Sequence, residues 1–214
     1  MKERPILFIT EMVRALLDGR KTQTRRVMKP QPKTCEGHTP NWQSQILDWV
    51  GYKYSNREHW FCHTCGIGLH HIDEYSAHGI ICPYGQAGDH LWVRETWADM
   101  VCVASTEKGK GKGESNPIYK STADSTELKI LQGHWKPSIF MPRWASRITL
   151  EITGIRVQRV QEISFQDITA EGVDDGQDIH YEELWDSING KKYLWSSNPW
   201  VWVIEYKRLI GATA

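Results

Sequence analysis

Apolar residues recur along the chain in short alternating or helical patterns, which predict many short strands and a few short helices. The segment PILFIT at 5–10 is apolar and rich in β-branched residues, as buried strands are. Residues 11–18 carry apolar side chains at spacings of three and four, so we expect an amphipathic helix that Thr10 caps and Gly19 ends. The segment TQTRRVM at 22–28 then predicts a second strand.

The second half of the chain shows the same two patterns. Ser164 is a suitable N-cap and Gly172 a suitable stop for a helix, and Gly154 separates two strand-like stretches. Strands are expected within 88–97, 147–153, 155–161 and 199–209, and helices over 164–173 and near 180–188. Many short strands with few short helices predict a compact α+β domain built on a small β-barrel.

Residues 33–82 interrupt these patterns, because they are polar, weakly periodic and rich in Cys, His, Asn and Gly. We therefore expect a main domain made of 1–32 and 83–214, with 33–82 inserted into it. The loop at 105–116 is also expected to lie outside the barrel, because its Gly, Lys and Ser content is that of a flexible segment.

The insertion carries two pairs of metal-ligand residues, in CEGH at 35–38 and CHTC at 62–65. Both pairs have the spacing of a zinc knuckle, in which a turn directs two ligands at one tetrahedral ion. A metal would supply the folding energy that so polar a segment lacks. The predicted ligands of this structural zinc are Cys35, His38, Cys62 and Cys65, and the competing candidates are Cys82, His63, His70, His71 and His78.

Charge and composition exclude some partners. The 214 residues include 26 basic and 26 acidic ones, so the chain is not a polycation, but residues 1–30 are mainly basic and residues 162–186 mainly acidic. Such polarity suits an internal electrostatic contact or a binding face beside an acidic wall. No apolar run is long enough to span a membrane and no signal peptide is evident, so we expect a cytoplasmic protein whose cysteines are thiols or metal ligands.

The segment LLDGRKTQTRR at 16–26 has two interpretations. Basic residues and a glycine commonly end a helix, so Lys21 and its neighbours can be a solvated helix end. Alternatively, the turn holds catalytic groups: a desolvated Lys21 beside arginines would have a lowered pKa and could act as a base.

Four segments in this order resemble the ASCH family, a branch of the PUA-like superfamily. They are GRKTQTRR at 19–26, GDHLWVRE at 88–95, ISFQDITAEGV at 163–173 and PWVWVIEYKRL at 199–209. The resemblance covers roughly residues 3–30 and 85–209 and implies a small β-barrel with flanking helices, associated with RNA or nucleosides. The segments MKERPILF at 1–8, GRKTQTRRV at 19–27 and MPRWASRITLEITGIRV at 141–157 resemble the version carried by phages and prophages, which implies a bacterial host.

Small bacterial members of the family remove acyl groups from the exocyclic amine of cytidine, using a Lys, a Thr and a Glu. The resemblance places these roles on Lys21, Thr24 and Glu171, as base, nucleophile and proton donor to the leaving amine. It also suggests substrate contacts by Arg20, Arg26, Arg94 and Trp92. Two other functions remain open: an RNA- or modified-base-binding module that stacks bases on Trp92, Trp97 or Trp144, and an ASCH-type ribonuclease.

Overall fold

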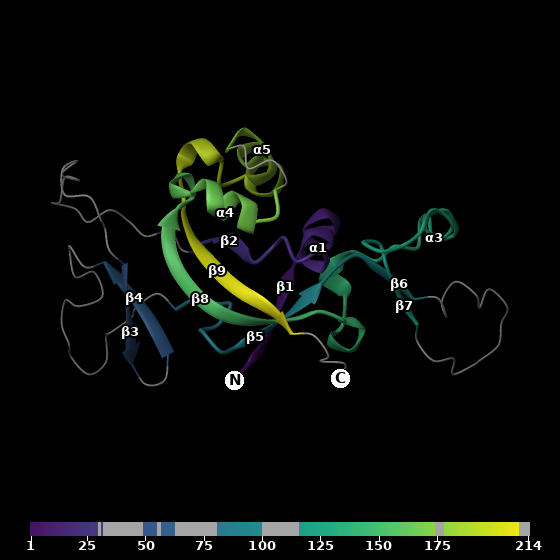
Figure 1. Ribbon diagram of the computed structural model, residues 1–214, viewed down its shortest axis with the longest axis horizontal. Helices are drawn as coiled ribbons and strands as arrows, with labels where there is room; N and C mark the ends of the chain where they lie inside the picture. Colours follow the sequence, from purple (N-terminus) through teal and green to yellow (C-terminus); the bar gives the residue numbers. More distant parts are fainter. Residues whose placement is uncertain are drawn as a thin grey trace.

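The computed structural model describes residues 1–29, 31, 49–54, 57–62, 81–99, 116–173 and 178–209, with the backbone alone for 49–54, 57–62 and 178–180. Its centre is a mixed five-stranded sheet of order β1-β5-β8-β9-β2 (Figure 1). Only β1 and β5 run parallel, and the other neighbours are antiparallel. The five strands are β1 (Glu3–Leu7), β2 (Gln23–Val27), β5 (His90–Arg94), β8 (Thr149–Arg159) and β9 (Trp200–Leu209).

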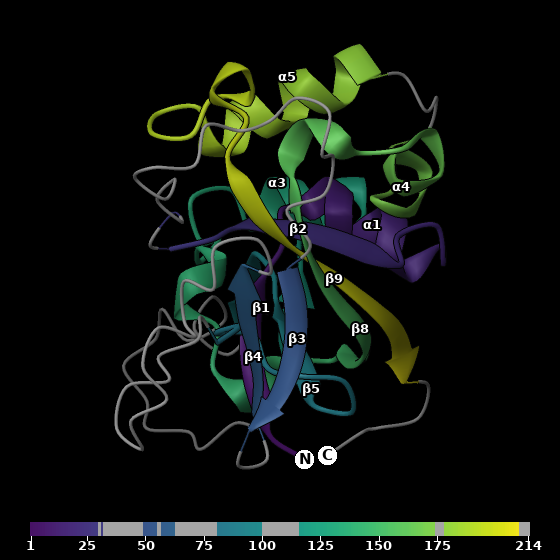
Figure 2. The ribbon, with the colours of Figure 1, turned by 90° about the vertical axis from the view of Figure 1, so that its left-hand side faces the viewer.

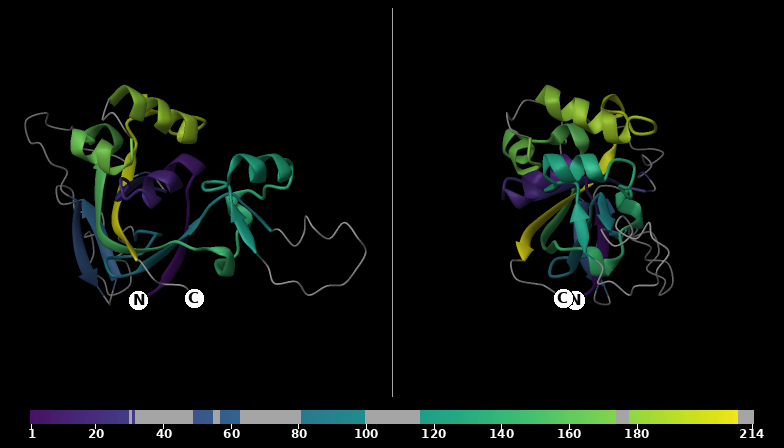
Figure 3. Two further views of the ribbon diagram at one scale, coloured as in Figure 1. Left: turned by 45° about the vertical axis from the view of Figure 1, so that its right-hand side comes forward. Right: turned by 90° about the vertical axis from the view of Figure 1, so that its right-hand side faces the viewer.

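Two further pairs of strands stand apart from this sheet in their hydrogen bonding. One pair is β3 (Trp49–Tyr54) with β4 (Arg57–Cys62), and the other is β6 (Trp97–Asp99) with β7 (Pro117–Tyr119). Figure 3 shows β6, β7 and the short helix α3 (Ser125–Ile130) projecting together away from the sheet.

The remaining helices lie mainly around one end of the sheet. Figure 2 shows α4 and α5 at that end of β8 and β9, with α1 close to β2. The helices are α1 (Thr10–Leu17), α4 (Phe165–Ala170) and α5 (Asp178–Asn189), and the 3₁₀ turns are η1 (Ser138–Phe140), η2 (Arg143–Ala145), η3 (Val160–Glu162) and η4 (Trp195–Ser197).

Strand β9 supplies side chains to two hydrophobic cores, because alternate residues of a strand point to opposite faces. Trp202, Ile204 and Tyr206 pack on one face with β1, β5 and α1. Val201 and Val203 pack on the other face with α4 and α5. The near-continuous apolar sequence of β9 therefore reflects burial on both faces.

The α+β class is confirmed, as are the predicted helices at α1, α4 and α5 and the strands at β1, β2, β5 and β9. Two local predictions were wrong. The residue before α1 is Ile9, without a side-chain cap, and Thr10 is already helical. The two strands expected around Gly154 are one strand, β8, whose register shifts between Ile152 and Gly154. A β-bulge lets a strand bend without ending.

The predicted barrel is not shown. Within the described residues the sheet is open, with β1 and β2 at its edges and no ladder between them. The two edges nevertheless come close, because the Arg26 guanidinium on β2 donates from Nη2 to the Leu7 carbonyl at 2.7 Å. Among the described helices, none is long and apolar enough to cross a membrane.

Candidate active site

Lys21 lies in a turn held between the ends of two helices. The backbone N–H groups of Arg20 and Lys21 donate to the Ala15 carbonyl of α1 at 2.9 and 3.0 Å. The next N–H, that of Thr22, donates to the Ala170 carbonyl of α4 at 2.8 Å. These bonds satisfy helix-end carbonyls that would otherwise lack partners, and they fix the turn.

Glu171 is placed by the start and the end of α4. Ser164 and Asp167 form a capping box at the N-terminus of α4, so the helix begins at a defined residue. Glu171 is the C-cap, and Gly172 follows with a φ of +86°, the left-handed conformation that glycine adopts readily. The sequence AEG thus turns the chain and directs Glu171 inward, where it is buried.

Lys21 and Glu171 form an ion pair that is closed to solvent. Lys21 Nζ lies 2.7 Å from Glu171 Oε2 and 2.7 Å from the Glu171 backbone carbonyl oxygen. The two side chains are 0% and 3% exposed. Tyr181 donates its hydroxyl to Glu171 Oε1 at 3.5 Å, and Arg25 Nη1 lies 3.5 Å from the same oxygen without hydrogen-bond alignment.

This environment lowers the pKa of the Lys21 amine. Burial is the largest cause, because it disfavours the ammonium form, and the Glu171 carboxylate opposes it. The cations of Arg26 and Arg25 add to the lowering. Lys21 is therefore easier to deprotonate than an ordinary lysine, which is what a catalytic base requires.

Thr24 is fully buried, and its hydroxyl has no hydrogen-bond partner within the described residues. It pairs with Ile204 of β9, so its side chain lies on the face of the sheet that packs against α1. Lys21 Nζ lies 5.7 Å from the centroid of Phe8, on the same core face. The structure thus brings Lys21 and Glu171 into contact, while Thr24 lies on the Phe8 side with its hydroxyl unbonded.

Arg26 adds a second cation to this face. Its guanidinium carbon lies 5.3 Å from the Phe8 centroid, beside the ring that Lys21 also approaches. Burial raises the pKa of the Tyr206 hydroxyl well above its usual value, and the Glu171 charge adds to this while Arg26 opposes it. Tyr206 instead donates a hydrogen bond to the Gln23 carbonyl at 3.2 Å.

The opposite face of β2 carries a second group of charges, centred on Asp167 of α4. Asp167 accepts from Arg25 Nη2 at 3.0 Å and from Arg156 Nη2 at 2.8 Å. Arg156 also donates from Nη2 to Gln23 Oε1 at 3.1 Å and contacts Glu205. A Cβ at Gly154 would lie 3.0 Å from Glu205 Oε2, so the glycine leaves room for that carboxylate.

The other residues predicted to contact substrate make structural contacts elsewhere in the described structure. Arg20 pairs with Asp18 at 3.0 Å and donates to the Gly172 carbonyl at 3.3 Å. Arg94 donates to the backbone carbonyls of Met141, at 3.0 Å, and Ile139, which shapes the turn at η1. Trp92 lies beneath the Arg94 guanidinium, 5.3 Å from ring centroid to carbon.

The predicted zinc site falls largely outside the described residues. Cys35, His38 and Cys65 are not described, and Cys62 is known only as the last residue of β4. Cys82 is buried in the core on the α1 side of the sheet. Within the described residues, no group of three His, Cys, Asp or Glu side chains is arranged to hold a metal.

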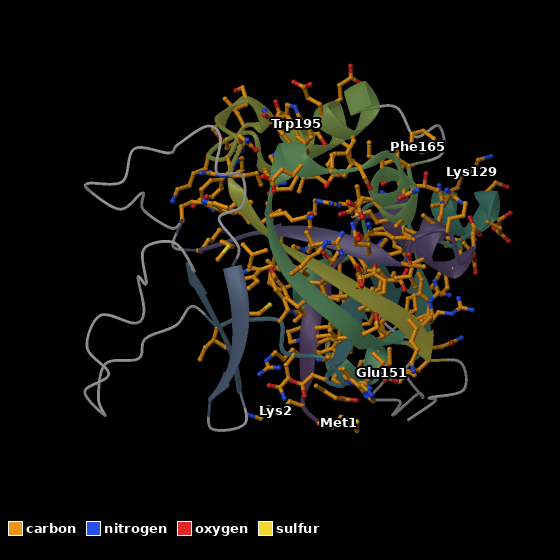
Figure 4. All side chains as sticks on the ribbon, turned by 60° about the vertical axis from the view of Figure 1, so that its left-hand side comes forward. Met1, Lys2, Lys129, Glu151, Phe165 and Trp195 are labelled. Carbon is orange, nitrogen blue, oxygen red and sulfur yellow. The ribbon has the colours of Figure 1, made fainter. Side chains whose placement is uncertain are left out.

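Sequence analysis missed Gln23, Asp167 and Arg156. The signal that could have found them is strand β2, because its sequence QTRRV places polar residues on both faces. An edge strand of a small domain normally exposes one of its faces to solvent. Gln23 and Arg25 are each 3% exposed, so their burial depends on α4 covering them. Figure 4 shows α4 against this region, with the labelled Phe165 at its start, 66% exposed on the outer side.

Comparison with family models, with curated proteins and with solved structures finds no match for this chain.

Proposed function

We propose that the protein is an amidohydrolase that removes acyl groups from the exocyclic amine of cytidine. The buried pair of Lys21 and Glu171 carries this proposal: their polar atoms are 2.7 Å apart and the pKa of Lys21 is lowered. A lysine with a lowered pKa beside a carboxylate is an acid–base pair of the kind used in amide hydrolysis. The resemblance to the ASCH family supplies the substrate class.

The chemistry proceeds in two halves. Neutral Lys21 takes the proton of the Thr24 hydroxyl, and the Thr24 oxygen bonds to the amide carbon. The C–N bond then breaks, and the leaving amine receives the proton that Lys21 took from Thr24, either directly from the Lys21 ammonium or relayed through the Glu171 carboxylate. Water attacks the resulting Thr24 ester, which releases the carboxylic acid and restores the threonine. Arg26 and nearby backbone N–H groups are suited to stabilise the oxyanion.

Substrate entry requires a movement in this mechanism. Lys21, Thr24 and Glu171 are all buried, so a nucleoside reaches them only if α4 moves away from β2. In the described structure Asp167 and Glu171 make the ion pairs of the α4 segment, with Arg25, Arg156 and Lys21. Such a movement also breaks the hydrogen bond from the Thr22 N–H to the Ala170 carbonyl. Loop and helix displacements of this kind occur on the microsecond to millisecond scale and often limit turnover.

The decisive test is hydrolysis of N4-acetylcytidine, followed chromatographically, by wild type and by Lys21→Met and Thr24→Val. We expect turnover by wild type and none above background by either variant. Because the Thr24 hydroxyl makes no hydrogen bond within the described residues, Thr24→Val should not lower stability. Lys207→Met, at an exposed lysine, is the matched control and should retain full activity. Absence of turnover by folded wild type would overturn the proposal.

One observation favours the alternative of an RNA- or base-binding module. The turn from η1 to η2 exposes Ile139, Phe140 and Trp144 at 53%, 64% and 57%. Arg94 fixes its backbone, and exposed aromatic rings on a rigid turn are suited to base stacking. Salt-dependent retention of labelled RNA, weakened by Phe140→Ala and Trp144→Ala, would support this function, and cleavage of the RNA would support a ribonuclease.

Two structural proposals accompany the functional one. We propose that the sheet is a PUA-like barrel whose edges meet near Arg26 and Leu7, supported by the 2.7 Å hydrogen bond between β2 and β1. We also propose that the insertion holds a structural zinc through Cys35, His38, Cys62 and Cys65, supported by the spacing of these residues.

A further inference from the structure

The buried face of β2 toward α4 carries hydrogen-bond donors without acceptors. Gln23 Nε2, Arg25 Nε and Arg25 Nη1 are all buried and have no hydrogen-bond partner within the described residues. Leaving such donors unsatisfied costs about 1–3 kcal/mol each, so proteins rarely do it except where another molecule supplies the acceptor. Their clustering on two residues of one strand face points to a binding site.

These donors adjoin the Lys21–Glu171 pair. Arg25 Nη1 is 3.5 Å from Glu171 Oε1, while Lys21 holds the other carboxylate oxygen, Oε2. Gln23 and Arg25 are two residues apart on β2, so their side chains share a face. Glu171, Arg25 and Gln23 therefore offer successive polar contacts to a single ligand that lies along the strand.

The ligand must present acceptors and need not be charged. Lys21, Arg25 and Arg156 are each ion-paired with carboxylates of this cluster, namely Glu171, Asp167 and Glu205, so these charges already have counter-ions. A buried anion would add a charge without a counter-ion, which costs several kcal/mol, whereas a neutral acceptor would not. This balance favours an uncharged ring with adjacent acceptors over a phosphate.

We infer that Gln23 and Arg25 are specificity-determining residues that bind the N3 and O2 acceptors of the cytosine ring. This inference rests on the proposed function, because the exocyclic nitrogen at C4 is adjacent to N3 and is then placed beside Glu171. Uracil carries an N3–H donor where cytosine has an acceptor, so it meets these donors with the wrong polarity. A site built to hydrogen-bond a ring discriminates strongly against such a mismatch.

The test compares binding of cytidine and uridine by calorimetric titration. Wild type should bind cytidine at least about tenfold more tightly than uridine, since one mismatched buried hydrogen bond has that effect. In the order Glu171, Arg25, Gln23, the Arg25 guanidinium faces N3, while Gln23 Nε2 faces O2, which cytosine and uracil share. Arg25→Lys keeps the charge near Asp167 but removes the guanidinium donors, so it should reduce the preference for cytidine over uridine. Gln23→Glu replaces the Nε2 donor by an acceptor and keeps Oε1 for Arg156, so it should weaken the binding of cytidine and of uridine alike.

Gln158→Glu is the matched control. Gln158 accepts a hydrogen bond from Arg25 at 3.4 Å, but it is not among the described residues with an unsatisfied buried donor. Its preference should stay that of wild type. If wild type hydrolyses N4-acetylcytidine but Arg25→Lys leaves the cytidine preference unchanged, the inference is wrong and the proposed function stands. If Arg25→Lys loses the preference but wild type shows no hydrolysis, base recognition stands and the hydrolase does not. Tighter binding of cytidine 5′-monophosphate than of cytidine at this face would also overturn the inference.

Discussion

The α-carbon of Gly172 lies against the side chain of Ala15, so closely that a Cβ at Gly172 would be 2.8 Å from the Cβ of Ala15. The same Cβ would lie 3.1 Å from the Cβ of Lys21. The end of α4 therefore packs directly on α1 and on the lysine of the candidate site. A glycine follows Glu171 because any larger residue there would clash with Ala15 and Lys21.

Gly172→Ala should destabilise the protein and displace Lys21. The positive φ of Gly172 costs an alanine about 1 kcal/mol, and overpacking against Ala15 adds about 1–3 kcal/mol. Urea unfolding measures the change in the free energy of unfolding. Gly133→Ala is the control, because Gly133 also has a positive φ but faces open space, so only the backbone cost applies. Equal losses in both variants would contradict the packing contact.

The periodic parts of this fold could be predicted from the sequence because they are buried on a regular face. Helix α1 and strand β9 are such cases, with apolar residues at helical and strand spacing. The bulge at Gly154 could not be predicted, because a glycine between two apolar stretches ends a strand as readily as it bends one. Open or closed sheet geometry likewise depends on strand pairing, which no local pattern encodes.

For the candidate site, the sequence identified the residues that meet but not the residues that surround them. Lys21 and Glu171 were paired by resemblance alone, and the structure puts them in contact. Sequence analysis did not single out Arg156 or Asp167. Only tertiary packing reveals their role, because α4 lies over β2 and buries Arg25, and Asp167 then pairs with both Arg25 and Arg156.

Asp167→Asn should lower stability at pH 7 by about 1.5–3 kcal/mol, because it weakens charged hydrogen bonds to Arg25 and Arg156. Burial acts to raise the pKa of Asp167, but Arg25, Ser164 and Arg156 outweigh it and lower the pKa below 3.8. Unfolded Asp167 thus binds a proton more readily, and its stabilising contribution is lost as the pH falls through and below that value. Thermal unfolding between pH 7 and pH 3 should show wild type approaching the variant. A constant difference would contradict this assignment.

Purified protein should contain about one zinc ion per chain by elemental analysis, as expected for four ligands of one tetrahedral site. Cys62→Ser should reduce the zinc content, because it removes one predicted thiolate ligand. Cys82→Ser is the same chemical change at a cysteine buried in the main core, and it should leave the zinc content unchanged. A loss of zinc in Cys82→Ser would move the ligand set to Cys82, and an absence of metal from wild type purified without chelators would refute the site.

Glu171→Gln should destabilise the protein by about 3 kcal/mol or more at pH 7, because it leaves the buried Lys21 ammonium without its carboxylate. Glu151→Gln is the matched control: Glu151 lies 3.2 Å from Lys207, but both are partly exposed, so the loss should stay below about 1 kcal/mol. Urea unfolding of both variants at pH 7 measures these differences.

The same pair predicts how the penalty of Glu171→Gln changes with pH. Burial already holds the pKa of Lys21 below 10.5, and removing the carboxylate that opposes this effect lowers it further. Between the folded and unfolded pKa values the unfolded chain binds more protons, so the stability of the variant rises with pH. Its deficit relative to wild type should therefore shrink from pH 7 to pH 9.5, while that of Glu151→Gln stays constant. A deficit that grows with pH would show that Lys21 remains an ammonium ion without Glu171, and would remove the basis for assigning it as a base.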